Sequence, residues 1–111
     1  MTIRELVKKL NLKVYSSEKG LDKEISSGYC SDLLSDVMGN AKEGQIWITL
    51  QTHKNVMAIA SLKDLSAVIL VNNHQPNKDT LAASNEEELP ILGTDKPAFE
   101  ICGILYQLLI K

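Results

Sequence analysis

The alternation of apolar and polar positions is clearest between residues 44 and 73. Two short apolar runs, Ile46–Leu50 and Ala67–Val71, flank a segment with helical periodicity that ends near Lys63. Both runs are rich in β-branched residues and are short enough to be buried strands, and the segment between them is long enough for one crossover helix. The stretch therefore predicts a β-α-β unit, and such units build parallel sheets that are covered by helices.

The same pattern predicts the remaining elements of a small α/β fold. Thr2 and Glu5 form a capping box for a first helix that ends near Asn11. Further strands are expected at residues 12–15, 24–26 and 89–92, and the first two of these are placed to pair as a hairpin. Further helices are expected at residues 31–38, at residues 77–85 and from Pro97 onward. We predict one α/β domain over residues 1–111, with an N-terminal helix (1–11) and a core (12–111). The core is expected to be a mostly parallel sheet of about four or five short strands with helices packed on it.

Two of these helices carry predictions about burial. Residues at i, i+3, i+4 and i+7 give the helix at 31–38 one buried face, made of Cys30, Leu33, Leu34 and Val37. Ser31 or Asp32 is its expected cap. The last helix is apolar over more than half of its circumference, so it is either deeply docked or covered by a second subunit. The crossover helix is expected to be capped by Thr52 or Asn55.

Charge and composition exclude several classes of function. The net charge is −2 and the cationic residues are scattered, which argues against a general nucleic-acid binder. No run approaches the ~20 apolar residues that span a bilayer, and the N-terminus lacks the apolar segment of a signal peptide. We therefore expect a cytoplasmic protein that does not bind membranes. Cys30 and Cys102 lie in apolar settings and are interpreted as reduced core thiols; a disulfide between them stays open.

Polar residues follow the predicted strands, at the sheet edge where open α/β sheets usually bind ligands. Backbone N–H groups at the helix starts, with Lys54 as a charge partner, would favour a nucleotide or another phosphate-bearing metabolite there. The alternative is that these residues are ordinary caps and turns. The candidate ligand-binding residues are Thr52, His53, Lys54, Asn72, Asn73, His74, Thr94 and Asp95.

Other chemistry is less well supported. The glycines Gly39 and Gly44 have the spacing of a Walker A loop, but the Lys and Ser/Thr that should follow are missing and a strand comes next. His53 and His74 lack metal-ligand spacing. We find no catalytic constellation, and we predict no metal and no cofactor. Glu86–Glu88 is expected to be a solvated turn, and Trp47 is expected in the core.

Four segments carry a family likeness: GYCSDLLSDVMG, KEGQIWITL, AVILVNN and LPILGTDKPAFEICGILYQLL. In this order, over about Leu12 to Leu109, the chain resembles a DRTGG domain. That fold is similar to the N-terminal domain of HPr kinase/phosphorylase and, more remotely, to the N-terminal domains of Mur ligases. The letters D-R-T-G-G are absent. Where relatives have a glycine and a basic residue, this chain has Gln51–Lys54, in which Lys54 takes the basic position and the glycine is missing.

The resemblance implies a regulatory module, because such domains commonly stand beside a separate enzymatic domain, and free-standing members occur in clostridial-type bacteria. Kinase activity is not carried over, since it would require a phosphate-binding loop. Our expectation is a non-catalytic regulatory or protein-interaction module, homodimeric and acting on a protein partner. The alternative is a sensor of a small ligand, a nucleotide or another phosphate-bearing metabolite, that uses the strand-end residues.

Overall fold

Five strands form a single sheet in the computed structural model, which describes residues 1–110. The strand order is β1-β5-β4-β3-β2, so β4 is central and β1 and β2 are the edges. β2–β3, β3–β4 and β4–β5 pair in parallel, whereas β1 runs antiparallel to β5. The predicted mostly parallel α/β fold is confirmed. The strands are β1 (Lys13–Ser16), β2 (Gly28–Cys30), β3 (Ile46–Thr49), β4 (Ala67–Leu70) and β5 (Ile91–Gly93).

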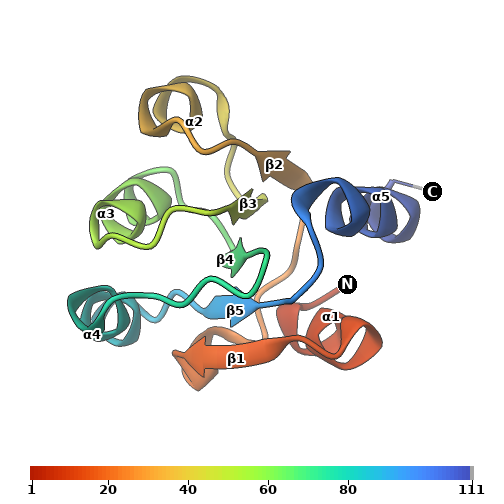
Figure 1. Ribbon diagram of the computed structural model, residues 1–111, viewed down its shortest axis with the longest axis horizontal. Helices are drawn as coiled ribbons and strands as arrows, with labels where there is room; N and C mark the ends of the chain where they lie inside the picture. Colours follow the sequence, from red (N-terminus) through yellow and green to blue (C-terminus); the bar gives the residue numbers. More distant parts are fainter. Residues whose placement is uncertain (111) are drawn as a thin grey trace.

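Helices cover both faces of this sheet. The helical elements are α1 (Ile3–Leu10), the 3₁₀ turn η1 (Glu18–Gly20), α2 (Leu34–Asn40), α3 (Asn55–Leu62), α4 (Lys78–Glu87) and α5 (Ala98–Leu109). Helices α2, α3 and α4 lie on one face, and α1 and α5 lie on the other (Figure 1). The predicted β-α-β unit is β3-α3-β4, and every residue of β3 and β4 is buried.

The core is divided by the sheet into two clusters. Ile46 and Ile48 of β3 belong to the cluster under α1 and α5, whereas Trp47 belongs to the cluster under α2, α3 and α4. This alternation follows from the two-residue period of a strand. Trp47 is completely buried, as predicted, and its indole N–H donates a 2.8 Å hydrogen bond to the carbonyl oxygen of Ser31.

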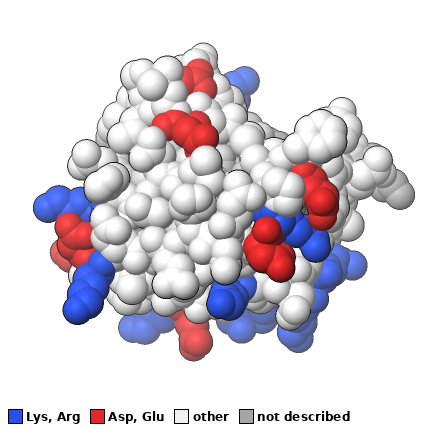
Figure 2. Space-filling model, in the orientation of Figure 1, with Lys and Arg blue, Asp and Glu red and all other residues white. Residues whose placement is uncertain are grey.

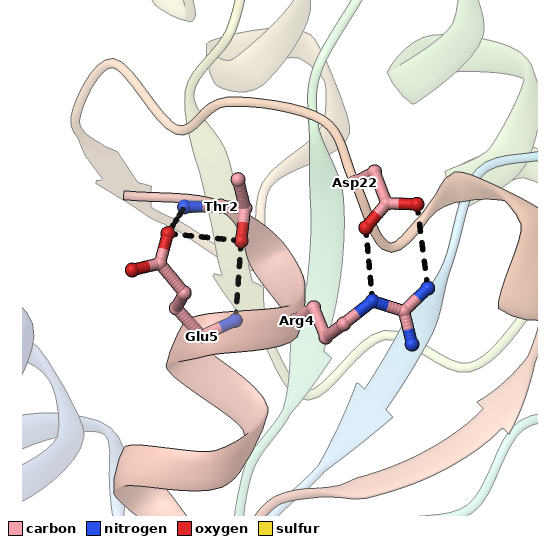
Figure 3. Close-up of polar contacts among 4 residues, drawn as sticks. All are labelled: Thr2, Arg4, Glu5 and Asp22. Carbon is pink, nitrogen blue, oxygen red and sulfur yellow. Dashed lines mark hydrogen bonds and ion pairs between the residues drawn. The ribbon is translucent and has the colours of Figure 1, made fainter.

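Helix α1 begins with the capping box that the sequence predicts. The Thr2 hydroxyl accepts from the backbone N–H of Glu5, and the Glu5 carboxylate accepts from the backbone N–H of Thr2 (Figure 3). In the same first turn, Arg4 pairs with Asp22 through Nε at 2.9 Å. This pair is exposed to solvent, so apolar burial of Ile3 and Leu6 is the main force that docks α1.

The prediction of a strand at residues 24–26 is wrong. Glu24 makes only an isolated antiparallel bridge to Thr2, and β1 pairs with β5 in place of forming a hairpin with this segment. The second strand is instead Gly28–Cys30, which lies at the opposite edge of the sheet against β3. A glycine-led run of three residues carries almost no strand signal, and its conformation comes from pairing with Ile46–Ile48.

The helix predicted at residues 31–38 begins later than expected, and its predicted face is mostly wrong. Of that face, only Val37 is buried, and Leu33 is 64% exposed. Asp32 does not cap the helix: its carboxylate accepts hydrogen bonds from the Thr49 hydroxyl at 2.8 Å and the Leu50 backbone N–H at 2.7 Å. Because Asp32 is held at the end of β3, α2 starts only at Leu34.

Smaller differences concern the other helix starts and the last strand. The N-cap position of α3 is occupied by Lys54. The two predicted caps, Thr52 and Asn55, do not occupy it. Asn77 is the N-cap of α4, as predicted, although its side chain makes no capping hydrogen bond. Helix α4 continues to Glu87, and the last strand is displaced toward the C-terminus relative to the prediction.

Candidate functional site

The parallel strands β4 and β5 bring part of the predicted polar edge together. The Asn73 backbone N–H donates to the Thr94 carbonyl oxygen at 2.8 Å, and the Asn72 backbone N–H donates to the Lys96 carbonyl oxygen at 3.0 Å. Both asparagines have positive φ angles, 54° and 60°, a conformation that asparagine tolerates better than most residues. The two loops are therefore joined to each other at the carboxyl end of the sheet.

A groove of about 630 Å³ opens beside these loops. It contains three of the predicted residues, Asn73, Thr94 and Asp95, together with two cations that the sequence reading missed, Lys13 and Lys96. Lys13 pairs with Gly93, because β1 runs antiparallel to β5 and so begins where β5 ends. The groove thus combines amide, hydroxyl and ammonium groups with the carboxylate of Asp95, and its two lysines supply the positive charge that an anionic ligand requires. Its other lining residues are Leu10, Asn11 and Leu12.

The remaining predicted site residues lie in other places. Thr52 faces α4, where its carbonyl oxygen accepts from the Thr80 hydroxyl at 2.7 Å, and His53 Nδ1 lies 3.4 Å from Nδ2 of Asn77. Lys54 lines a separate groove of about 280 Å³ that also contains Glu86 and Glu87. His74 is exposed in the turn after β4. In residues 1–110, no cluster of three or more His, Cys, Asp or Glu side chains could hold a metal ion.

A third groove carries buried hydroxyl groups that have no hydrogen-bond partner. It measures about 670 Å³ and lies between the end of β1 and the end of α4. Tyr15 and Ser17 line it, and within the described part of the chain their hydroxyl oxygens are buried and unpaired. Ser17 also has a positive φ of 61°, and its backbone N–H donates to Asn85 Oδ1 at 2.8 Å. Because both oxygens are buried, neither is exposed to the open space of the groove.

An apolar cavity of about 290 Å³ lies between the edge strand β2 and helix α5. Cys30 and Cys102 both line it, with Ile48 and Leu105 among the apolar walls. Neither cysteine is the core thiol that the sequence suggested: Cys30 is exposed at the sheet edge and Cys102 is half-buried, and both are free. Burial of the thiol, and then its interaction with Cys102, raise the pKa of Cys30 to about 11.

The outer side of α5 carries large apolar side chains that the fold does not cover. Phe99 is 92% exposed and Tyr106 is 66% exposed, and Ile110 follows at the end of the helix. With Gly103 they occupy positions i, i+4, i+7 and i+11, which form one stripe along a helix. We call these four residues the outer stripe. The opposite side of α5 contributes Ile101 and Leu105 to the core, so that side is docked as predicted, and coverage of the outer stripe by a second subunit stays a prediction.

The charges nearest the outer stripe lie at its N-terminal end, where the exposed pair Lys96 and Glu100 brackets Phe99. Between Ile101 and Ile110 the sequence has no Lys, Arg, Asp or Glu. In Figure 2, the middle of the viewed face is uncharged, and acidic and basic side chains gather together on its right-hand side. No helix within residues 1–110 combines the length and apolar character needed to cross a membrane. An exposed apolar stripe of this kind is typical of a contact surface between proteins.

Among the comparisons with known proteins, the comparison with solved structures gives a match to the fold. No protein-family model and no curated protein matches this sequence. The structure is similar to that of the CBS and DRTGG domains of the regulatory region of Clostridium perfringens pyrophosphatase, complexed with the activator diadenosine tetraphosphate, with a TM-score of 0.69 and 14% identity. The match covers 94% of this chain and 45% of that chain. At this identity the likeness establishes a shared fold, and it supports the DRTGG-like fold that the sequence suggested.

Proposed function

We propose that this chain is a non-catalytic regulatory module that forms a homodimer through the outer stripe of α5 and acts on a protein partner. The observation that carries the proposal is the exposed apolar stripe on a helix whose other side is already docked in the core. The regulatory role is supported by the fold that this chain shares with a pyrophosphatase regulatory region. Membership among DRTGG-type domains, with a relation to the HPr kinase N-terminal domain, is part of the same proposal.

A second copy of the chain is the occupant that fits this stripe best. In a twofold dimer the same surface meets itself, so it must be complementary to itself. An uncharged stripe satisfies this condition, because no like charges are brought together. Burying Phe99 and Tyr106 would remove roughly 300 Å² of surface per subunit, at about 150–250 Å² for a whole aromatic side chain. A stable interface needs about 800 Å² per partner, so these two residues would supply a large share of it.

Gly103 adds a second argument for a helix packed against this stripe. A Cβ atom at this position would meet nothing within 4 Å, so the fold itself does not require glycine there. Glycine in the middle of an exposed helix costs about 1 kcal/mol relative to alanine. A glycine flanked by Phe99 and Tyr106 allows another helix to approach closely, which explains the residue if α5 packs against its copy.

The test of the dimer is light scattering combined with size-exclusion chromatography over a range of concentrations. We expect the wild-type chain to be dimeric and Phe99→Glu to weaken the dimer by at least about thirtyfold, the effect of losing roughly 2 kcal/mol at an interface hot spot. Leu62→Glu is the matched control, because Leu62 is 70% exposed on α3, on the other face of the sheet. A monomeric wild type, or equal weakening by both variants, would contradict the proposal.

Gly103→Ala provides a test with effects of opposite sign. The monomer should gain up to about 1 kcal/mol in unfolding free energy from the better helix propensity of alanine. The dimer should weaken, because the added methyl group separates the two helices. Denaturation at low concentration measures the first effect and light scattering measures the second. A variant that dimerises as tightly as the wild type would exclude close helix packing at this position.

The second candidate function is a sensor of a phosphate-bearing ligand in the strand-end groove. It is favoured by the convergence of Lys13 and Lys96 on the predicted residues Asn73 and Thr94. Thr52, His53, Lys54, Asn72, His74 and Asp95 remain candidates from the sequence. The neighbouring structure contains a nucleotide activator, which makes nucleotides the first ligands to test.

Lysine variants discriminate between the two possible sites for such a ligand. The amide spectrum of the labelled chain would be titrated with a panel of nucleotides and sugar phosphates. If the groove binds one of them, the signals of Asn73 and Thr94 shift, and Lys13→Gln weakens binding more than Lys54→Gln does. If Lys54→Gln has the larger effect, the ligand lies at the α3 start instead. Unshifted amides throughout the panel would contradict a ligand-sensing function.

A further inference from the structure

We propose that Cys30 and Cys102 form an oxidative modification site, in which the two thiols join as an intramolecular disulfide across the cavity between β2 and α5. They are the only two cysteines in the sequence, and they come from elements that are distant along the chain. Both are free thiols and both line the same cavity. The inference does not depend on the proposed dimer or on the proposed ligand.

The geometry favours an internal bond. Cys30 ends the edge strand β2, and Cys102 lies in the second turn of α5, which packs directly against β2. A disulfide requires Cα atoms within about 7 Å and side chains directed toward each other. Both thiols line the same small cavity, and the interaction with Cys102 is among the causes that raise the pKa of Cys30. A strand at the edge of a sheet has room to adjust to the bond.

The surroundings of the two thiols predict that their oxidation is slow. Apolar walls from Ile48 and Leu105 disfavour a thiolate in the cavity. The other titratable groups near Cys30 are Cys102, the carboxylate of Asp32 and the phenol of Tyr106, and none of these is a cation. Since the thiolate is the reactive form, oxidation is slow at neutral pH and requires sustained exposure to an oxidant.

The reaction is an exchange with a low-molecular-weight disulfide. One cysteine, as its thiolate, attacks a sulfur atom of the reagent; the reagent S–S bond breaks, and one reagent thiolate leaves. The second cysteine, as its thiolate, then attacks the protein sulfur of the mixed disulfide and releases the other reagent thiolate. The protein loses two electrons and two protons, and the reagent disulfide is reduced to two thiols.

The experiment uses the wild-type chain, incubated with oxidised glutathione at low protein concentration and then alkylated. We expect an intact mass of the monomer lower by two hydrogens, no alkylation, and a peptide that joins Cys30 to Cys102. The thermal midpoint should rise by at least about 5 °C, because the bond closes a long loop of the unfolded chain. Cys30→Ser and Cys102→Ser should each take up one glutathione and lack this rise.

Two results would overturn the inference: a wild-type chain that carries two mixed disulfides, or one that links to a second chain through Cys30 or Cys102 without an internal bond. The decisive measurement is made on the wild type, so it remains valid even if a serine variant folds poorly. Mass spectrometry reports the internal bond and light scattering reports the dimer, so the failure of one proposal leaves the other testable.

Discussion

Helices α2 and α5 flank the same edge strand, β2, yet they are held in place by different forces. Helix α5 inserts Ile101 and Leu105, which are 0% and 2% exposed, into the core beneath the sheet. Helix α2 fully buries Val37, packs the half-buried Leu34 beside it, and adds a polar contact to β2. Its Asp36 carboxylate accepts from the Tyr29 hydroxyl of β2 at 2.9 Å and, within the helix, from the Asn40 side-chain amide at 2.9 Å. Apolar burial can be predicted from the periodic spacing of apolar residues in the sequence, whereas these hydrogen bonds leave no such pattern.

The largest change in unfolding free energy is expected when apolar burial under α5 is removed. Ile101→Ala should lower the unfolding free energy by about 2–5 kcal/mol, because it removes a fully buried side chain and leaves a cavity. Phe99→Ala, on the outer side of the same helix, should change the stability of the monomer by less than about 0.5 kcal/mol. Urea denaturation at a concentration where the chain is monomeric measures both values. Similar losses for the two variants would show that Phe99 also packs within the monomer.

The contrast explains how far the sequence predicts the fold. Positions such as Ile48, Ile101 and Leu105 repeat with the period of their element, so β3 and α5 are predicted close to their observed bounds. The strand Gly28–Cys30 has no such repeat and depends on its pairing with β3, which only the tertiary structure supplies. The late start of α2 likewise depends on Asp32, whose partners Thr49 and Leu50 are distant in the sequence.

The candidate site follows the same rule. Asn73 and Thr94 are predicted together because consecutive parallel strands end at one edge of the sheet. Lys13 could not be placed with them, since its position depends on the antiparallel pairing of β1 with β5, a contact between distant segments. Lys54 was grouped with them only by its place after β3, and in the structure it lines a groove beside α4.

The second effect concerns the polar contacts at the start of α2. Asp32→Ala should lower the unfolding free energy by about 1–2 kcal/mol, since two donors, the Thr49 hydroxyl and the Leu50 N–H, lose a charged acceptor. Ser35→Ala, an exposed change on α2 itself, is the control and should have little effect. Hydrogen exchange provides a local readout, because the Leu50 amide should exchange faster in Asp32→Ala. Unchanged protection of that amide would show that Asp32 does not fix the end of β3.

The smallest effect concerns the protonation of Tyr29 and Asp36. Hydrogen bonds from Ser31 and then from Tyr29 lower the pKa of Asp36, and the hydrogen bond to Asp36 raises the pKa of Tyr29 above 10.0. Asp36 therefore stabilises the fold above the ordinary pKa of an aspartate, and this contribution is lost as the pH falls through its lowered pKa. Tyr29 stabilises the fold below pH 10, and its contribution is lost as the pH rises through its raised pKa.

Asp36→Asn tests this coupling directly. The amide still fills the space beside Tyr29 but carries no charge, so the pKa of Tyr29 should fall back toward its ordinary value. The tyrosinate absorbance of the wild type, of Asp36→Asn and of Tyr29→Phe, followed against pH, isolates the Tyr29 component from the other two tyrosines. If Tyr29 titrates identically with and without the Asp36 charge, the hydrogen bond between them does not hold α2 to β2 in solution, and the apolar packing of Val37 and Leu34 must anchor that helix.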